Sequence, residues 1–405
     1  MQAVAQRDDR HPFAPFRRHQ RFAPWAGVVR ERGLADVDDI ERRARASSGN
    51  LLLPRSMTAS KVAPTGREAR AEGESGSMPR VLVVTNMWPS PTRPAFGSFV
   101  AAQVASLRDA GVEVAIHVIR GDAHLAAYLT DVPVIARKVR EFDADLVHAH
   151  YGLAGWSASW QRRPLVVSFC GDDLLGTPGM TGRLTWKSRV AIRMSHRAAR
   201  RADAIICKSE NLRQALPADE DRRRAVVVPN GVDLTQFHPG DRLAARARLG
   251  LQPDAALVLF PHAPDQRAQK RFDLAEAAVA LAALQLAGVQ LLPVSGIAHE
   301  VMPDWYRAAD CLLLTSRAEG SPNTVKEALA SGLPVVSVDV GDVRHWLHRV
   351  SGCEIAEPRA DALAAAMVRV LRGDRQVDPT PVLLELDHAL AASRVVEVYR
   401  SLLPA

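Results

Sequence analysis

The sequence comprises 405 residues, of which 47% are apolar and only four are cysteines, and its formal net charge is +7. At roughly 100 to 200 residues per domain, this length predicts two or three domains, each large enough for a hydrophobic core. A disulfide scaffold, a collagen-like repeat and a wholly disordered chain are therefore excluded. Cys170, Cys207, Cys311 and Cys353 form no CxxC pair, which argues against a zinc ribbon and fits a reducing compartment.

The positive charge is unevenly divided along the chain. Residues 1–77 hold 14 Lys and Arg against 10 Asp and Glu, which leaves 38 basic and 35 acidic residues for 78–405. That excess is too small for a general nucleic-acid-binding protein, so no nucleic acid is expected among the partners.

Residues 1–77 differ in composition from everything that follows. They are polar, rich in Arg and interrupted by Pro, which predicts a disordered N-terminal arm. Charges occupy the place of a signal peptide's apolar core. A buried strand follows Met78 at once, so Met78 is a candidate biological start; the alternative is that 1–77 form a targeting or docking arm.

From residue 80 onward, short apolar strands alternate with helices. In the first half we expect strands at 80–85, 112–119, 145–150, 164–169, 203–209 and 225–231, and helices at 97–110, 131–141 and 183–201. Apolar strands without polar alternation predict a parallel sheet that is covered on both faces. The first half is therefore predicted to be a doubly wound α/β domain.

The second half repeats this pattern on a smaller scale. We expect strands at 256–261, 289–294, 310–316, 334–339 and 352–357, helices at 272–287, 303–308 and 323–331, and a final helix at 385–403. Residues 274–294 come nearest to a membrane span, but a helix followed by a strand explains them better. Two such domains leave a cleft at the carboxyl ends of their strands, where open α/β sheets bind ligands.

The most specific stretch is TSRAEGSPNTVKEALASG at 315–332. Its loop carries Glu319 after a strand, Asn323 is expected to begin the next helix as its N-cap, and Glu327 falls one turn into that helix. Carboxylates accept hydrogen bonds from hydroxyls, and a helix N-terminus favours phosphate. The arrangement suits a ligand with several hydroxyls and a diphosphate.

This stretch, VVVPNGVDLTQFHP at 226–239 and DLVHAHYGLAG at 145–155 together resemble the retaining glycosyltransferases of family 4, close to the branch of teichuronic acid and other cell-surface polysaccharide enzymes. The resemblance covers roughly residues 79–403. It implies the GT-B architecture, in which two Rossmann-like domains face a cleft. The acceptor-side domain would be 78–235 with the crossing helix 385–403, and the nucleotide-sugar-binding domain would be 236–384.

The resemblance also implies a role for each matching residue. Glu319 would contact the transferred sugar, and Glu327 would accept the ribose hydroxyls. Lys270 would neutralise the leaving diphosphate in place of a metal. His150 resembles the family histidine near the donor sugar. The diphosphate or sugar would lie against the backbone of Gly320, Ser321, Pro322, Asn323 and Thr324.

The sequence departs from the family in two loops. The strand at 256–261 lacks the usual Gly-Arg pair after it, and Arg267 is the candidate replacement. The loop after the first strand keeps only Gly97, with Arg93 as a candidate contact for an anionic acceptor. Asp172 is a candidate for helix capping or acceptor contact in preference to a metal site. No GxGxxG follows the first strand, which argues against a nicotinamide or flavin cofactor.

Residues 183–201 contain seven Lys and Arg and no acid. Arg189, Arg193, Arg197 and Arg201 recur on every fourth residue, beside Trp186, Val190 and Met194. This pattern is typical of two structures, a solvated outer helix and an amphipathic helix that rests on anionic lipid.

The sequence therefore predicts a metal-independent, retaining glycosyltransferase without a resident cofactor. It would use a UDP- or GDP-linked sugar to extend a cell-surface glycan or a lipid-linked saccharide, in the cytoplasm or peripherally on the inner face of the plasma membrane. Two alternatives stay open: another GT-B enzyme, such as a nucleotide-sugar epimerase or a phosphorylase, and a non-catalytic GT-B scaffold, which the missing Gly-Arg pair favours.

Overall fold

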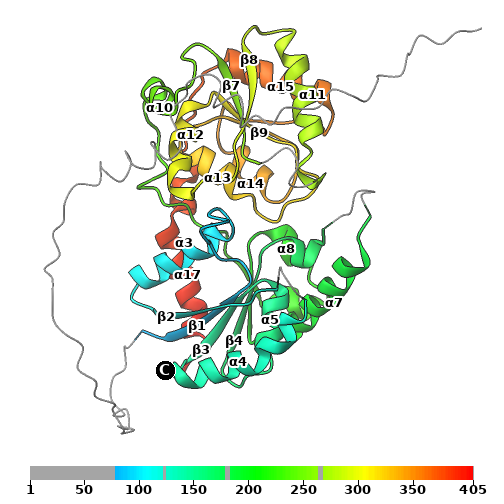
Figure 1. Ribbon diagram of the computed structural model, residues 1–405, viewed down its shortest axis with the longest axis vertical. Helices are drawn as coiled ribbons and strands as arrows, with labels where there is room; N and C mark the ends of the chain where they lie inside the picture. The colour runs from blue at the N-terminus through cyan, green and yellow to red at the C-terminus, as the bar shows by residue number, and fades with distance from the viewer. Residues whose placement is uncertain (1–77, 122–124, 178–182, 263–267, 405) are drawn as a thin grey trace, which may run out of the picture. The chain divides into compact units, whose positions relative to one another are not determined.

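The computed structural model describes residues 78–121, 125–177, 183–262 and 268–404. The predicted arm at 1–77 and the candidate phosphate contact Arg267 lie outside these ranges. Two parallel β-sheets organise the described residues (Figure 1). The predicted α/β class with two sheets is confirmed.

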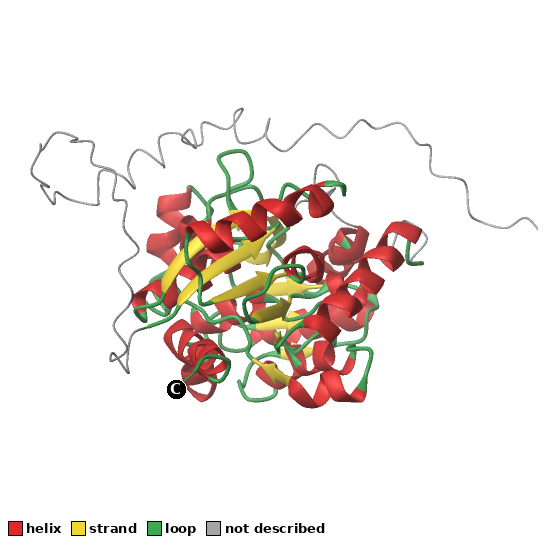
Figure 2. Ribbon diagram, turned by 90° about the horizontal axis from the view of Figure 1, so that it is seen from below, coloured by secondary structure: helices red, strands yellow, loops and turns green. Residues whose placement is uncertain are grey.

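The first sheet has the strand order β2-β1-β3-β4-β5-β6, and every neighbouring pair is parallel. Its strands are β1 (Arg80–Thr85), β2 (Glu113–Val118), β3 (Leu146–His150), β4 (Leu165–Phe169), β5 (Ala204–Cys207) and β6 (Ala225–Val227). The helices of this half are α3 (Ser98–Asp109), α4 (Ala127–Glu141), α5 (Gly152–Ala158), α6 (Asp172–Leu175), α7 (Trp186–Arg201), α8 (Glu210–Gln214) and α9 (Asp219–Arg224). Figure 2 shows helices flanking the strands.

The second sheet has the order β11-β10-β9-β7-β8 and is also parallel. Its strands are β7 (Ala256–Phe260), β8 (Val289–Pro293), β9 (Cys311–Leu314), β10 (Val335–Ser337) and β11 (Glu354–Ile355). Its helical elements are α10 (Arg242–Leu249), η1 (Ala268–Lys270), α11 (Phe272–Ala283), η2 (His299–Val301), α12 (Met302–Ala308), α13 (Asn323–Ala330), α14 (Val343–Leu347) and α15 (Ala360–Arg372).

Each sheet has a hydrophobic cluster on both faces, because successive strand side chains point to opposite sides. In β1, Leu82 and Val84 pack with Tyr128 of α4, whereas Val81 and Val83 pack on the other face. The same alternation makes two clusters around the second sheet. Burial on both faces explains why the strands read as unbroken apolar runs.

The last helix, α17 (His388–Arg400), follows the second sheet in the chain but packs on the first. Val395 and Tyr399 join the same cluster as Val81 and Val104, and Figure 1 draws α17 beside α3. The Pro-rich segment VDPTPV at 377–382, before this helix, includes the start of another helix, α16 (Thr380–Leu386).

The chain passes between the two sheets at two neighbouring points. Val232 and Asp387 form a parallel bridge. The amide of Val232 donates to the Leu386 carbonyl at 2.6 Å, and the His388 amide donates to the Val232 carbonyl at 3.1 Å. Gly231 lies so close to this segment that a Cβ there would be 2.3 Å from the Cα of His388.

The candidate membrane span at 274–294 is divided between α11 and β8, as predicted. Among the helices that the structure describes, none is long and apolar enough to cross a membrane.

Candidate active site

Lys270 and Glu319 form the central ion pair at the carboxyl end of the second sheet. Lys270 Nζ lies 2.5 Å from Glu319 Oε1, and the two side chains are only 14% and 13% exposed. The hydroxyl of Thr315, directly after β9, donates to the Lys270 carbonyl at 2.7 Å, and the Gln269 side chain donates to the Ala318 carbonyl at 2.7 Å. These bonds fix the loop of Lys270 against the loop of Glu319.

Glu327, within α13, is held by two residues that the sequence reasoning missed. The hydroxyl of Tyr306 donates to Glu327 Oε2 at 2.7 Å, and His299 Nε2 lies 2.9 Å from Oε1. Burial alone would lower the pKa of His299, but the hydrogen bond and charge of Glu327 outweigh it and raise the pKa above 6.5. Since a carboxylate offers about four acceptor positions, Glu327 keeps acceptor capacity for a ligand hydroxyl.

The N-terminus of α13 differs from the prediction in its cap. Asn323 is the first residue of the helix, and Pro322 stands at the N-cap without a side-chain hydrogen bond, so the N-cap role expected for Asn323 is wrong. The Asn323 carboxamide oxygen instead accepts a bond from Asn230 Nδ2 at 3.2 Å. The Val325 amide donates to the Pro322 carbonyl at 3.2 Å. The amides of Asn323 and Thr324 have no acceptor within the helix and remain suited to an anion.

The hydroxyl of Ser321 already takes part in a partly buried network. It donates to Asp342 Oδ2 at 2.7 Å and accepts from Lys326 Nζ at 3.0 Å. Lys326 is fully buried and also donates to the Asn230 carbonyl at 3.1 Å. Ser321 therefore orders the loop with its side chain, which leaves its backbone for the contact that the resemblance implies.

Gly320 brings this loop against the carboxyl end of the first sheet. A Cβ at Gly320 would lie 2.6 Å from the Cys170 carbonyl oxygen and 2.8 Å from the Gly171 Cα, so no larger residue fits. The Ser209 hydroxyl donates to the Gly320 carbonyl at 2.6 Å, and Asn211 Nδ2 donates to the Glu319 carbonyl at 3.2 Å.

His150 ends β3 and is fully buried, and among the described residues neither of its ring nitrogens has a hydrogen-bond partner. Burial, with smaller effects of His148 and Lys208, lowers its pKa well below 6.5, so the ring is neutral. His148 contrasts with it, because Tyr399 at 2.6 Å and Ser168 at 2.7 Å bond to its two nitrogens. His148 is structural; His150 has bonding capacity to spare.

Lys208 follows β5 and is also fully buried, and the sequence reasoning did not select it. Its Nζ donates to Gln103 Oε1 of α3 at 2.9 Å. Burial lowers the pKa of Lys208 from 10.5 to about 8. The available signal was its position, a lysine directly after a buried strand.

Gly97 and Arg93 both lie in the loop after β1. Gly97 has a φ of 77°, and a Cβ there would lie 2.4 Å from the Met87 carbonyl carbon, so glycine is required for the loop's own packing. Arg93 is exposed and stacks over the Phe96 ring at 4.5 Å.

Asp172 and Asp173 have different roles. Asp172 accepts a bond from the Thr177 hydroxyl at 3.0 Å, whereas buried Asp173 accepts bonds from the amides of Gly152, Cys170 and Gly171. Burial, with the charge of Asp172, raises the pKa of Asp173 to about 6 despite those amides. Helix capping by Asp172, one of its two predicted roles, is wrong, because Gly171 is the N-cap of α6 and no side chain caps it. The carboxylate that holds the neighbouring backbone amides is Asp173.

Comparison with known proteins identifies the family. A model described as Glycosyltransferase Family 4 matches residues 79–236, and one described as Glycosyl transferases group 1 matches 245–373. D-inositol 3-phosphate glycosyltransferase 1 of Catenulispora acidiphila is 31% identical over 312 residues, covering 64% of this chain and 72% of that protein. The chain belongs to glycosyltransferase family 4.

Other relatives of this glycosyltransferase carry the same kind of name. The D-inositol 3-phosphate glycosyltransferase of Frankia alni is 30% identical, covering 65% of this chain and 74% of that protein. That of Geodermatophilus obscurus is 29% identical and covers 58% of this chain, which spans only 60% of the relative. The predicted closeness to teichuronic acid enzymes stays a prediction.

Solved structures show the fold. Sucrose-phosphate synthase from Thermosynechococcus elongatus superposes with a TM-score of 0.64 at 17% identity, covering 80% of this glycosyltransferase and 99% of that chain. HepE of Anabaena in complex with UDP and glucose gives a TM-score of 0.58 at 17% identity, with 80% and 100% covered. The predicted GT-B architecture is confirmed.

Proposed function

We propose that this glycosyltransferase transfers a sugar from a nucleotide-sugar donor to a hydroxyl of its acceptor, with retention of configuration and without a metal. The observation that carries the proposal is the Lys270–Glu319 pair beside the N-terminus of α13. A leaving diphosphate gains negative charge, which a lysine and free helix amides stabilise electrostatically.

In the proposed mechanism, Glu319 holds Lys270 in place and contacts the transferred sugar. Glu327, fixed by Tyr306 and His299, accepts the ribose hydroxyls. The acceptor hydroxyl attacks from the face that the diphosphate leaves, and the departing phosphate oxygen takes its proton, so no dedicated protein base is required. Neutral His150 has one ring nitrogen that can donate a hydrogen bond to a sugar hydroxyl and one that can accept a hydrogen bond from it.

We propose a UDP-linked sugar as the first candidate donor and a GDP-linked sugar as the second. HepE of Anabaena, which shares this fold, is described in complexes with UDP, with UDP and glucose, and with UDP-glucose. No feature of the described site selects the base, so both classes belong in the test.

The acceptor is proposed to be a phosphorylated cyclitol, because the relatives at 29–31% identity are named D-inositol 3-phosphate glycosyltransferases. Exposed Arg93 in the loop after β1 is an anionic acceptor's candidate partner.

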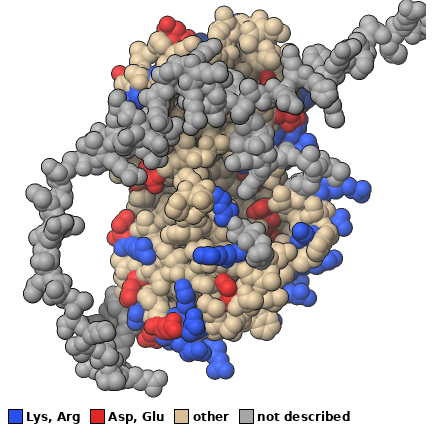
Figure 3. Space-filling view, viewed as in Figure 1, with Lys and Arg blue, Asp and Glu red and all other residues tan. Residues whose placement is uncertain are grey.

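A lipid-linked saccharide is the second candidate acceptor, and the surface of α7 favours it. Trp186 is 68% exposed and Val190 is 40% exposed, next to exposed Arg189, Arg193 and Arg197. Lys and Arg side chains gather at the right of Figure 3, where Figure 1 draws α7. Exposed Trp beside basic residues is typical of a helix that rests on anionic lipid.

The proposal is tested first by donor binding and then by transfer. We expect UDP- or GDP-sugars to raise the melting temperature of the protein. We expect Glu319→Ala and Lys270→Ala to lose sugar transfer to D-inositol 3-phosphate or to a lipid-linked saccharide. Both variants should keep the wild-type far-UV circular dichroism spectrum. Lys138→Ala is the matched control. Full activity of both site variants would overturn the assignment. Donor turnover without any acceptor would favour an epimerase or a phosphorylase, and failure to bind any nucleotide sugar would favour a scaffold.

The α7 surface has its own test. We expect the wild type to sediment with vesicles of phosphatidylglycerol, and the double variant Arg193→Glu and Arg197→Glu to stay in the supernatant. Exposed Arg359 and Arg369 of the second half, changed to Glu, provide the control of equal charge. Equal sedimentation of the two double variants would refute the membrane surface.

A further inference from the structure

A cavity of about 480 Å³ lies at the C-terminal end of α13, opposite the end proposed to bind the diphosphate. It is lined by residues from four segments: Gly240, Arg242, Tyr306, Arg307, Ala309, Ser331, Gly332, Leu333, Asp374, Arg375 and Gln376. The volume falls in the range of about 300 to 1,000 Å³ typical of small-molecule sites. It shares Tyr306, the partner of Glu327, with the donor site, but no residue proposed to contact donor or acceptor lines it.

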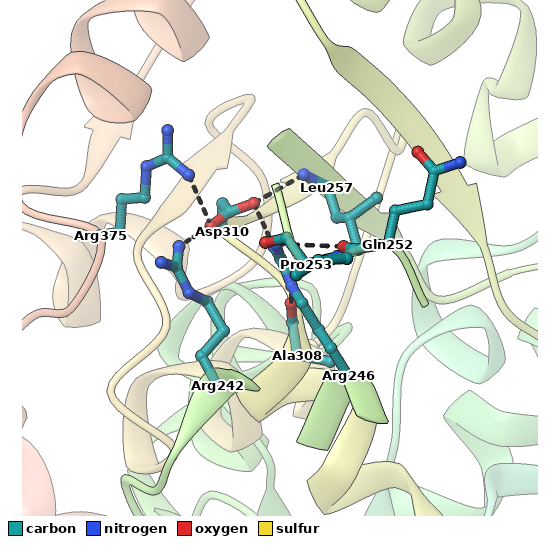
Figure 4. A network of polar contacts seen from close by, with 8 residues as sticks. All are labelled: Arg242, Arg246, Gln252, Pro253, Leu257, Ala308, Asp310 and Arg375. Carbon is teal, nitrogen blue, oxygen red and sulfur yellow. Dashed lines mark hydrogen bonds and ion pairs between the residues drawn. The ribbon is translucent and has the colours of Figure 1, made fainter. Parts of the chain in front are cut away.

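The charge of this cavity comes from a network around one buried carboxylate (Figure 4). Asp310, directly before β9, is fully buried and accepts bonds from Arg242, Arg246 Nη2 at 2.6 Å, and Arg375 Nη1 at 3.1 Å. The Leu257 amide donates to it at 2.7 Å. One negative charge thus faces three guanidinium groups.

Two of these guanidinium groups are accessible from the cavity. Arg246 is buried, but the side chains of Arg242 and Arg375 are 36% and 37% exposed and line the cavity wall. Each bonds to Asp310 through a single guanidinium nitrogen, which leaves further N–H donors. Arg307 also lines the cavity, but its guanidinium is paired with Asp304 and bonded to the carbonyls of His238 and Gln236. Asp374 is an acidic residue of the lining.

A buried hydroxyl provides a second, independent sign of a ligand. Ser331 is 4% exposed and lines the cavity, and among the described residues its Oγ has no hydrogen-bond partner. A buried hydroxyl without a partner is costly, and a polar ligand in the cavity that Ser331 lines would supply the missing bond.

We propose that this cavity binds a phosphate-bearing small molecule. Guanidinium groups match phosphate oxygens in geometry and charge, and a hydroxyl next to them supplies a further bond. The net positive lining excludes cationic ligands, and the volume leaves room for more than the phosphate group itself. The site is separate from the donor site and does not rest on the proposed function.

The experiment must keep the two sites apart, because Tyr306 lines the cavity while its hydroxyl bonds to Glu327 of the donor site. The full chain is therefore titrated in a calorimeter both as wild type and as Lys270→Ala, which removes the lysine of the donor site and leaves the cavity lining unchanged. The probes are inorganic phosphate, glucose 6-phosphate and, as the uncharged comparison, glucose. We expect one equivalent of a phosphate probe to bind at least tenfold more tightly than glucose. Preference for glucose 6-phosphate would identify a phosphate ester as the ligand, and preference for inorganic phosphate would identify the free anion.

Two variants locate the binding. Arg375→Gln keeps Arg242 and Arg246 on Asp310, and Gln376→Glu adds a negative charge to the lining without removing any of these bonds. Each is expected to weaken phosphate binding at least tenfold, whereas Arg359→Gln, on the exposed start of α15, leaves it unchanged. Wild-type protein that binds neither phosphate probe would overturn the proposal, as would binding that both cavity variants retain at full strength.

Discussion

The basic side chains at the carboxyl edges of the two sheets differ in burial and in ion pairing. At the first sheet, His150 and Lys208 are fully buried, and among the described residues neither forms an ion pair. At the second, Lys270 and His299 each pair with a glutamate and stay partly exposed. Burial is therefore the largest cause of the lowered pKa values of His150 and Lys208 at the first edge, whereas pairing with glutamate stabilises charge at the second. The difference supports the proposal that the second edge binds the charged diphosphate and the first edge makes neutral contacts with hydroxyls.

The largest expected effect concerns the paired edge. Lys270→Met removes the positive charge beside α13, and we expect the transfer rate to fall about 1,000-fold, the upper range for the loss of one electrostatic stabiliser in a site. The measurement is kcat with the donor found by the binding screen. Lys187→Met, at an exposed position of α7, serves as the control with a soluble acceptor. A loss below about tenfold would contradict the division between the two edges.

The next effect concerns stability at the unpaired edge. The pKa of Lys208 is lowered from 10.5 to about 8. Below pH 8 both the folded and the unfolded chain hold the proton, and the fold carries the whole cost of the buried charge. Between pH 8 and 10.5 only the unfolded chain holds it, so stability rises with pH. We expect this rise to be on the order of 3 kcal/mol.

Lys208→Met removes that rise. Urea unfolding at pH 7 and pH 10 measures it, and the difference between wild type and variant isolates Lys208 from other groups that titrate in this window. A variant that keeps the wild-type pH dependence would show that the lysine is not held in its buried state.

A third prediction compares the two neighbouring histidines of β3. His150→Leu removes two ring nitrogens without partners, so we expect unfolding to cost about 1 kcal/mol more than in the wild type, while transfer falls at least tenfold. His148→Leu leaves buried Tyr399 and Ser168 without their bonds and is expected to lose about 2 kcal/mol of stability. Equal destabilisation by both changes would mean that His150 is also structural.

The smallest effect is expected at the His299–Glu327 pair. The pKa of His299 is raised above 6.5, so the pair's contribution to stability is complete below about pH 6.5 and is lost as pH rises through the raised value. His299→Gln should therefore cost about 1 kcal/mol at pH 5.5 and less at pH 8.5. Melting temperatures at the two pH values test this, and an equal cost at both would remove the charge from the explanation.

The strands were predictable from sequence because each is a short run of buried apolar residues. The strand expected at 80–85 is β1 to the residue, and the others differ by one or a few residues at their ends. The helix α15 was missed, although ADALAAAMVRVLR has clear helical spacing and supplies Leu363 and Met367 to the core. The helical spacing of these apolar residues is sufficient to predict α15 from the sequence.

Most hydrogen-bond partners of the site residues could not be predicted from the sequence, because they come from distant parts of the chain that only the tertiary fold brings together. Tyr306 and His299 lie 21 and 28 residues before Glu327 in the chain, and Lys326 reaches Asn230 across 96 residues. The motif identified the residues that resemble the family's own, whereas burial and pairing, which decide their charge, appear only in the fold.

The two crossings between the sheets have a mechanical consequence. Val232 is hydrogen-bonded to Leu386 and His388, the two neighbours of Asp387, where the chain leaves and re-enters the first half, so the two connections are tied together along one short line. If the Gly320 loop were to part from Cys170, these bonds would survive a rotation about this line, whereas sliding would break the bonds of Val232 to Leu386 and His388. Gly231 packs against His388, and its lack of a side chain allows the two connecting segments to approach this closely.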